Sequence, residues 1–258
     1  MKFTQIRNAT LLIEYAGKKL LVDPMLADKG TYPGFEGTPN SHLNNPLVDL
    51  PCPIEALLDV DAVIVTHTHP DHWDEVAQQS IPKEMLIFAQ HQADAGVIRQ
   101  SGFSNIRVLS DNTDYDGIRL SITDGQHGSD EVMAVIGERM GEVSGVVLAH
   151  PDEPTLYIAG DTVWNPFVQS SIEQFQPEII VLNSGDAQVI GLGPIIMNKE
   201  DVLAVHEAAP NATIIASHME AVNHAVLTRE ALRQYLTENQ AMDRVLIPAD
   251  GESYLLTH

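Results

Sequence analysis

Six residues of the sequence bring three histidines and one aspartate together directly after a short apolar run. The run Asp61–Val65 is β-branched and leads into Thr66-His-Thr-His-Pro-Asp-His72. Such a run predicts a buried strand, so we expect the histidines at its carboxyl end, where a loop can turn them toward one point. A polar loop whose histidines only form hydrogen bonds is the alternative, but the density of imidazole and carboxylate groups favours a zinc, manganese or iron site.

The rest of the chain alternates strand and helix patterns, which predicts an α/β fold. An opening hairpin turns at Ala16-Gly17, and the segment 115–148 reads mostly as strand and turn. Helical stretches are expected over Gln92–Gln100, up to Phe175, and after the N-caps Asn198 and Thr228. The other expected strands are Thr10–Tyr15, Leu20–Asp23, Met85–Ala89, Ile106–Leu109, Thr155–Ala159, Ile179–Leu182, Ile214–Ala216 and Val245–Ile247. Since no linker or low-complexity segment interrupts this order, we expect a single domain over residues 1–258.

The segment Met25–Pro53 is rich in Gly, Pro, Asn and Ser and has no periodicity. It is too long to be a passive connector in a compact domain, so we expect it to be a loop that contacts the substrate. Its aromatic stretch 32–35, together with Trp164, could form apolar walls of a pocket. Lys29, Arg139 and Arg229 are the cations nearest to the expected rim.

Three further candidate ligands each follow an apolar strand pattern, namely His127, Asp161 and His218. Each is a weak signal alone, because a single histidine is more often an ordinary surface or core residue, and an aspartate after glycine is often a turn residue or helix cap. Their positions after strands are comparable to that of the histidine cluster, which makes a common site the better interpretation.

Taken together, HxHxDH at 67–72, His127, Gly160-Asp161-Thr162 and His218 resemble the metallo-β-lactamase superfamily. The end of the opening hairpin, Leu21-Val-Asp-Pro24, and the tail segment Asp250-Gly-Glu252 also resemble the branch that contains ascorbate-6-phosphate lactonase. The resemblance implies a four-layer αββα sandwich that holds two divalent metal ions. One ion would be held by His67, His69 and His127, the other by Asp71, His72 and His218, and Asp161 would bridge both. Asn8 departs from the Gly-His that many relatives carry, so no role for a histidine there can be transferred.

Two other assignments rest on position. His224 competes with His218 as the last ligand, and His218 is preferred because it directly follows the expected strand. Asp23 could orient a ligand imidazole or could simply accept hydrogen bonds in the turn before Pro24. Thr66 and Thr162 flank ligands and are expected to support them.

The amino-acid composition limits the kinds of partner that we expect this protein to bind. The chain carries 36 acidic and 14 basic residues, for a formal charge of -22, which disfavours nucleic acid. No apolar run reaches the roughly 18 residues of a membrane span, and the N-terminus lacks a secretory pattern, so we expect a cytoplasmic protein without a membrane partner. The single Cys52 lies between two prolines and is expected to pack rather than to react. A small molecule is the expected partner, and self-association into a homo-oligomer is left open.

The expected activity is that of a metal-dependent hydrolase. Two divalent ions, zinc first and manganese or iron as alternatives, would bridge a hydroxide that attacks a small ester, lactone, amide or phosphoester. Asp71 or Asp161 would accept the proton. A di-iron redox protein and a non-catalytic, metal-bound binding scaffold are the alternatives. The redox alternative is disfavoured because the related reductases need a flavin domain for which 258 residues leave no room.

Overall fold

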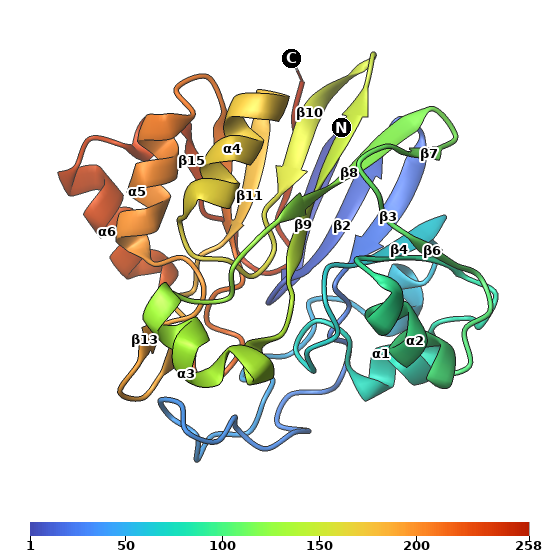
Figure 1. Ribbon diagram of the computed structural model, residues 1–258, viewed down its shortest axis with the longest axis horizontal. Helices are drawn as coiled ribbons and strands as arrows, with labels where there is room; N and C mark the ends of the chain where they lie inside the picture. The colour runs from blue at the N-terminus through green and yellow to red at the C-terminus, as the bar shows by residue number, and fades with distance from the viewer. Residues whose placement is uncertain (258) are drawn as a thin grey trace.

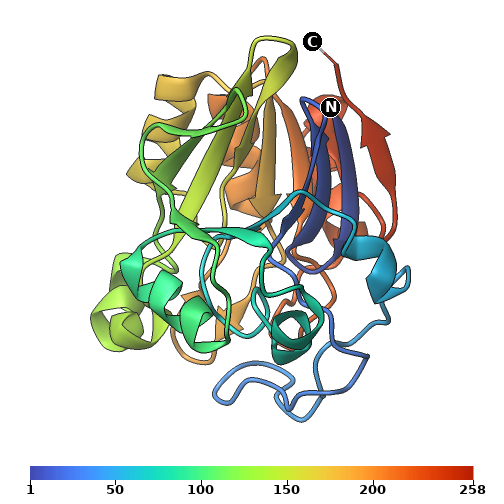
Figure 2. The same cartoon turned by 90° about the vertical axis from the view of Figure 1, so that its right-hand side faces the viewer.

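The computed structural model describes residues 1–257, and these residues form two seven-stranded β-sheets that pack face to face (Figures 1 and 2). The first sheet has the order β16-β1-β2-β3-β4-β5-β6. Its first strands pair antiparallel, and the run from β3 to β6 is parallel. The strands are β1 (Lys2–Arg7), β2 (Thr10–Tyr15), β3 (Lys18–Val22), β4 (Ala62–Val65), β5 (Leu86–Ala89), β6 (Ile106–Val108) and β16 (Ser253–Leu255).

The second sheet has the order β15-β14-β11-β10-β9-β8-β7 and is also mixed. Its strands are β7 (Thr113–Tyr115), β8 (Ile118–Asp124), β9 (Ser144–His150), β10 (Glu153–Ile158), β11 (Ile179–Asn183), β14 (Thr213–Ser217) and β15 (Val245–Leu246). A small hairpin of β12 (Gln188–Val189) and β13 (Gly193–Pro194) stands apart from both sheets.

Helices cover the outer faces of the two sheets (Figure 1). Helices α1 and α2 pack on the first sheet, and α4, α5 and α6 pack on the second. The predicted four-layer αββα sandwich is therefore confirmed. The helices are α1 (Glu75–Ser80), α2 (Gln92–Gln100), α3 (Asp130–Met140), α4 (Pro166–Phe175), α5 (Lys199–Ala208) and α6 (Arg229–Glu238), with short 3₁₀ turns η1 (Ile54–Leu57) and η2 (Met242–Arg244).

Strand β4 shows why a continuous apolar run was needed in the sequence. Ala62 and Ile64 face the core between the sheets, whereas Val63 and Val65 face the core under α1 and α2. Because side chains alternate along a strand, a strand covered on both faces must be apolar at every position. Burial of each large side chain contributes about 1.5–3 kcal/mol, and this packing fixes the strand that delivers the histidine cluster.

The interpretation of 115–148 as mostly strand and turn was wrong for its middle, because α3 occupies Asp130–Met140. The Ser129 hydroxyl accepts a hydrogen bond from the amide of Val132 and caps the helix. Val132, Ile136 and Met140 recur at a spacing of four, which places them on one helical face against the β12–β13 hairpin. The helical period was the signal that the strand interpretation overlooked. Ile136 has non-helical dihedral angles, so the helix is kinked there.

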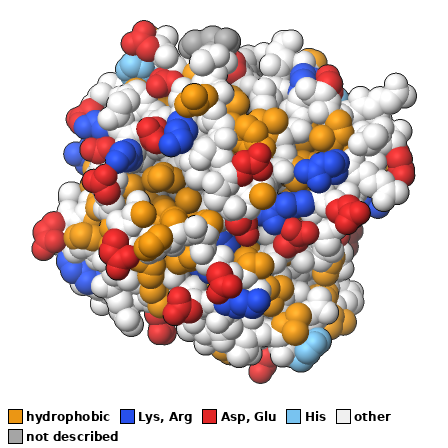
Figure 3. Space-filling view, turned by 180° about the vertical axis from the view of Figure 1, so that it is seen from behind, with side chains coloured by type: hydrophobic (Ala, Val, Ile, Leu, Met, Phe, Trp, Pro, Cys, Tyr) orange, Lys and Arg blue, Asp and Glu red, His pale blue; other side chains and the backbone are white. Residues whose placement is uncertain are grey.

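Two more features bear on the outer surface. No helix within residues 1–257 is long and apolar enough to cross a membrane. Seen from behind, the surface mixes acidic, basic and apolar side chains (Figure 3).

The expected loop is present, since Met25–Pro53 contains no helix or strand beyond an isolated bridge between Tyr32 and Asn45.

Candidate metal centre

The loops after four strands bring all seven predicted ligands to one edge of the sandwich. The histidine cluster follows β4 of the first sheet, and His127, Asp161 and His218 follow β8, β10 and β14 of the second. Ligand atoms within 4.8 Å of one another form three groups among the described residues. They are His67 with His69 and His127, His67 with His72 and Asp161, and Asp71 with His72 and His218.

Asp161 lies between the two halves of this centre. Its Oδ2 is 3.9 Å from Nε2 of His67 and 3.6 Å from Nε2 of His127. The same oxygen is 3.2 Å from Nε2 of His72, and Oδ1 is 3.8 Å from Nε2 of His218. A carboxylate in this position can share its oxygens between two cations, as the family resemblance implied.

The second half is equally compact. Oδ2 of Asp71 lies 3.2 Å from Nε2 of His218 and 4.0 Å from Nε2 of His72. His218 has a left-handed backbone, with φ of 58°, and its amide donates to the carbonyl of Asn8. The chain of Gly185 runs so close to His218 that a Cβ at Gly185 would overlap the His218 carbonyl oxygen. The position of this ligand therefore depends on a glycine in the neighbouring loop.

Groups behind the ligands fix their orientation. Asp23 Oδ2 lies 2.9 Å from His72 Nδ1, the contact that an orienting role requires, and the same carboxylate also accepts from the amide and hydroxyl of Thr66. His127 Nδ1 contacts the carbonyl of Ile195 at 2.8 Å. Thr162 accepts from the amide of Gln126, next to His127, and so has the expected supporting position.

Two asparagines that sequence reasoning did not assign also support the centre. Asn183, at the end of β11, donates to Asp161 Oδ1 at 2.7 Å. Asn8 donates to the backbone of Asp71, and its amide nitrogen lies 3.4 Å from His218 Nε2. Asparagines that follow or end apolar strands at the same edge are the signal that could have found them.

The charges of the centre suit a divalent cation. Burial alone would raise the pKa values of Asp71 and Asp161, but the adjacent imidazoles, His72 first, hold both well below the usual range. Burial would lower the pKa of His72, yet Asp161, Asp23 and Asp71 together raise it well above its ordinary value. In the absence of a cation, a proton on His72 thus compensates the carboxylates. Metal binding would displace that proton.

The side chain of His67 shows whether the residues of the centre fit a metal ion. Its pKa lies well below the ordinary value, chiefly because of burial, so the ring is neutral. Its Nε2 is buried and has no hydrogen-bond partner among residues 1–257. A buried lone pair that is unpaired and surrounded by imidazole and carboxylate groups is what a metal ligand requires. The residues present therefore fit metal ions.

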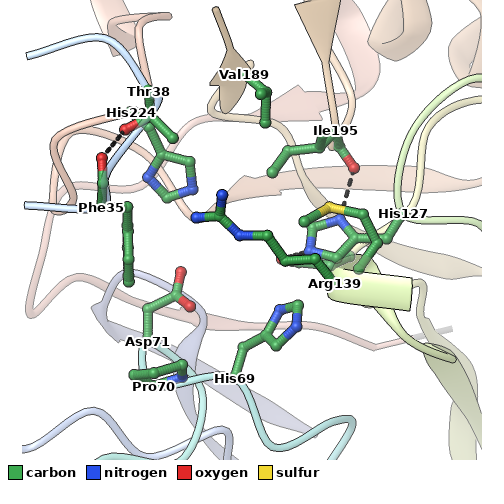
Figure 4. Close-up of a pocket in the computed structure, with 12 residues that line it drawn as sticks. Phe35, Thr38, His69, Pro70, Asp71, His127, Arg139, Val189, Ile195 and His224 are labelled. Atoms are coloured by element: carbon green, nitrogen blue, oxygen red, sulfur yellow. Dashed lines mark hydrogen bonds and ion pairs between the residues drawn. The ribbon is translucent and has the colours of Figure 1, made fainter. Parts of the chain in front are cut away.

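A cavity of about 270 Å³ opens onto the centre (Figure 4). His69, Asp71, His127 and Asp161 form its floor, and its walls include Phe35, Thr38, Arg139, Val189, Ile195 and His224. A second cavity of about 660 Å³ shares Phe35, Pro70 and Arg139 with the first. Its other walls include Tyr32, Pro33 and Trp73, and Figure 4 shows Arg139 reaching across the first cavity.

His224 lies in the wall of the first cavity rather than in any of the three ligand groups. The residue is 7% exposed, and its ring meets that of Phe35 edge-on with centroids 4.8 Å apart. Burial is the main cause that lowers its pKa to about 4, so the imidazole is neutral at pH 7. This arrangement agrees with the preference for His218 over His224 as a ligand.

The loop Met25–Pro53 is held at both ends by residues that sequence reasoning missed. Arg7 is fully buried and donates to the carbonyls of Met25, Ala27 and Val48. Asn223 is 1% exposed and binds the loop tip through four side-chain hydrogen bonds of 2.7–3.0 Å. These bonds reach Phe35, Asn45, Thr38 and Pro39. The loop is therefore fixed beside the cavity, as the substrate-loop hypothesis requires.

Some expected pocket residues lie elsewhere. Arg229 forms ion pairs with Glu220 at 2.6 Å and with Asp250 at 2.5 Å. Its positive charge is thus compensated by these carboxylates, and it does not line either cavity. Trp164 packs partly buried against the core under α4, α5 and α6. Lys29 is absent from the walls of both cavities. Cys52 is half-buried against the core beneath α1 and α2, consistent with a packing role.

Comparison with known proteins agrees with this geometry. The model of the beta-lactamase superfamily domain matches residues 18–219, a span that contains all seven predicted ligands. The fold and the buried histidine–aspartate centre thus define a metal-dependent hydrolase of the metallo-β-lactamase superfamily.

More specific relatives match the whole chain. The UPF0173 protein YddR of Bacillus subtilis is 51% identical over 255 residues, which cover 98% of this chain and 99% of that protein. The chain belongs to this UPF0173 family. A crystal structure of isothiocyanate hydrolase from Delia radicum gut bacteria is 54% identical, with a TM-score of 0.98 and full coverage of both chains. A possible metal-dependent hydrolase from Veillonella parvula is 42% identical, with a TM-score of 0.97 and 99% coverage of each chain. These relatives give no support to the finer likeness to ascorbate-6-phosphate lactonase.

Proposed function

We propose that the chain hydrolyses an organic isothiocyanate to an amine. The observation that carries the proposal is the likeness over the full length to an isothiocyanate hydrolase, at 54% identity and a TM-score of 0.98. At this likeness the cavity walls are expected to be largely shared, whereas the fold alone would leave the substrate open. Esters, lactones, amides and phosphoesters remain the competing substrates.

The proposed centre holds two divalent ions, zinc first and manganese or iron as alternatives. His67, His69 and His127 would hold one ion, Asp71, His72 and His218 the other, and Asp161 both, which agrees with two of the three ligand groups and with the position of Asp161. Bound ions would make water a nucleophile at neutral pH by lowering its pKa from about 15.7 toward 7.

The proposed reaction balances without a further reactant. The oxygen of water adds to the central carbon of R–N=C=S, and Asp71 or Asp161 takes the proton that water loses. Return of that proton from the carboxylate to the nitrogen gives R–NH–C(=S)–OH, and movement of the hydroxyl proton to sulfur gives its tautomer R–NH–C(=O)–SH. Cleavage of the carbon–nitrogen bond, with transfer of the thiol proton to nitrogen, then gives R–NH₂ and carbonyl sulfide.

The residues around the cavity favour direct attack by water. Among the described residues that line it, none is a serine or cysteine. The Thr38 hydroxyl donates to the Phe35 carbonyl and accepts from Asn223, so it is occupied. Attack by a side chain would need a nucleophile within reach of the centre. The larger cavity beside Tyr32, Phe35 and Trp73 offers room for the organic substituent.

The test is turnover by purified protein loaded with zinc, manganese or iron(II). Loss of isothiocyanate absorbance should match the release of amine, and chelation should abolish both. His67→Ala should be inactive, while His150→Ala, which removes a histidine on the β9–β10 hairpin, should match the wild type. Turnover of an ester, lactone, amide or phosphoester instead, with isothiocyanates untouched, would reject the proposed substrate and leave the hydrolase class standing.

Metal content gives an independent test of the ligand set. Elemental analysis should find close to two ions per chain in the wild type and close to one in His218→Ala. A wild-type content of one ion at saturating metal would contradict the two-ion centre.

A further inference from the structure

His224 is a buried polar side chain that the metal centre does not use. Within residues 1–257, Nδ1 of the His224 ring is buried and has no hydrogen-bond partner. A buried polar group without a partner is costly, so native proteins rarely keep one without a reason. A phenylalanine would fill the same wall without that cost. Since no acceptor faces Nδ1, the proton of the neutral ring is expected on Nε2, and this N–H is the group that can meet a partner from outside the chain.

The backbone holds this ring in place. The carbonyl of His224 accepts from the amide of Gln188 at 3.1 Å, and the preceding residue, Asn223, is bound to the loop tip by its own side chain. Phe35 covers one edge of the ring. A donor that is fixed before the substrate arrives needs no rearrangement during the reaction, which is the condition for electrostatic catalysis.

The ring faces the place where the reaction would occur. Figure 4 shows the imidazole projecting into the cavity that His69, Asp71 and His127 also face. A neutral imidazole carries one N–H group, which can donate a hydrogen bond, while its other ring nitrogen can only accept one. When water adds to the carbon of N=C=S, negative charge collects on nitrogen and sulfur. A donor in this wall would stabilise that charge.

We propose that His224 is a catalytic residue whose ring N–H donates a hydrogen bond to the nitrogen or sulfur of the substrate on which negative charge develops. The inference rests on the proposed isothiocyanate reaction and adds a residue that is not among the metal ligands. Arg139 also reaches the cavity, but it is exposed and donates to the carbonyl of Glu36 at 3.3 Å, so water screens its charge. The buried donor is the one that acts at the reacting atoms.

Two variants separate this role from a structural one. His224→Phe keeps an aromatic ring against Phe35 but has no donor, whereas His224→Gln keeps an N–H donor near the position of Nε2. We expect kcat to fall about 100-fold or more in H224F, with KM and metal content unchanged, since loss of one such donor costs about 10²–10³ in kcat. H224Q should recover to within about tenfold of the wild type.

Binding of the linear thiocyanate ion provides a readout without turnover. Calorimetric titration of zinc-loaded protein should show binding to the wild type and H224Q, and at least about tenfold weaker binding to H224F. If the wild type fails on isothiocyanates but the thiocyanate pattern holds, the proposed substrate is wrong and the donor role stands. Equal thiocyanate binding by all three proteins, absence of binding by the wild type, or loss of a metal ion from both variants would overturn the inference.

Discussion

The Oδ2 atom of Asp23 lies 2.9 Å from Nδ1 of His72, and the same carboxylate accepts from both the amide and the hydroxyl of Thr66. The residue that ends the first hairpin thus fixes the ring that faces the metal centre. A carboxylate at Nδ1 keeps the proton there and leaves Nε2 free to bind a metal.

Asp23→Asn should therefore weaken binding of the ion at His72 by about 10–100-fold. The amide can place its NH₂ group toward Nδ1, which favours the wrong tautomer. Calorimetric titration of the metal-free variant measures this loss. Asp59→Asn, which removes an exposed carboxylate paired with Lys19, serves as the control. Equal affinities in D23N and the wild type would show that Asp23 is only a turn residue.

Gly185→Ala should destabilise the loop that presents His218. The new methyl group would overlap the His218 carbonyl oxygen, so the backbone must move, at a cost of about 1–3 kcal/mol or more. Urea unfolding and metal analysis should show lower stability and less than two ions per chain. Gly96→Ala in α2 is the matched control, because a Cβ there meets nothing within 4 Å and alanine favours a helix by about 1 kcal/mol.

Asn223→Ala should release the tip of the Met25–Pro53 loop. Four hydrogen bonds are lost, and several loop groups remain unpaired, so we expect a loss of about 2–4 kcal/mol in stability. Limited proteolysis should cut this loop faster, and KM should rise more than kcat falls. Asn44→Ala removes one exposed hydrogen bond in the same loop and should leave both measurements near wild type. Unchanged proteolysis of N223A would argue against the clamp.

The stability of the metal-free protein should fall as pH is lowered from about 6.5 to about 4, in part because of His224. Its folded pKa is lowered to about 4 from 6.5, so over this interval the unfolded chain binds a proton that the folded chain does not. The contribution is about 3 kcal/mol, at about 1.36 kcal/mol per unit. Denaturant titrations over this range should therefore show a shallower loss in H224F, and parallel curves would contradict the shift.

Much of this site could be predicted because its ligands follow strands. The strand of Val63 and Val65 and the cluster from His67 to His72 lie next to each other in sequence, so a local pattern reveals both. His127, Asp161 and His218 needed the family resemblance, because each alone resembles an ordinary loop residue. The structure brings all seven together at one edge of the sandwich.

Other features could not be predicted because they depend on contacts between distant segments. Asn223 contacts Asn45 and Phe35 across more than 170 positions of sequence, and nothing near it in the chain marks it as a clamp. Arg7 reads as a surface residue in an alternating strand, yet it is buried among loop carbonyls. The helical spacing within α3 was overlooked, because its glycine and its kink at Ile136 make the pattern less regular than in the other helices.

The clamped loop Met25–Pro53 supplies walls of both cavities, but none of the seven predicted ligands. Substitutions between Tyr32 and Thr38 can therefore alter which molecule enters without altering the residues that activate water. Arg7 and Asn223 would keep each new version of the loop at the same place. Changes in this loop could thus alter the substrate during evolution while the metal-binding residues stay the same. Relatives that keep Arg7 and Asn223 but differ in the loop between them are expected to catalyse the same reaction on different substrates.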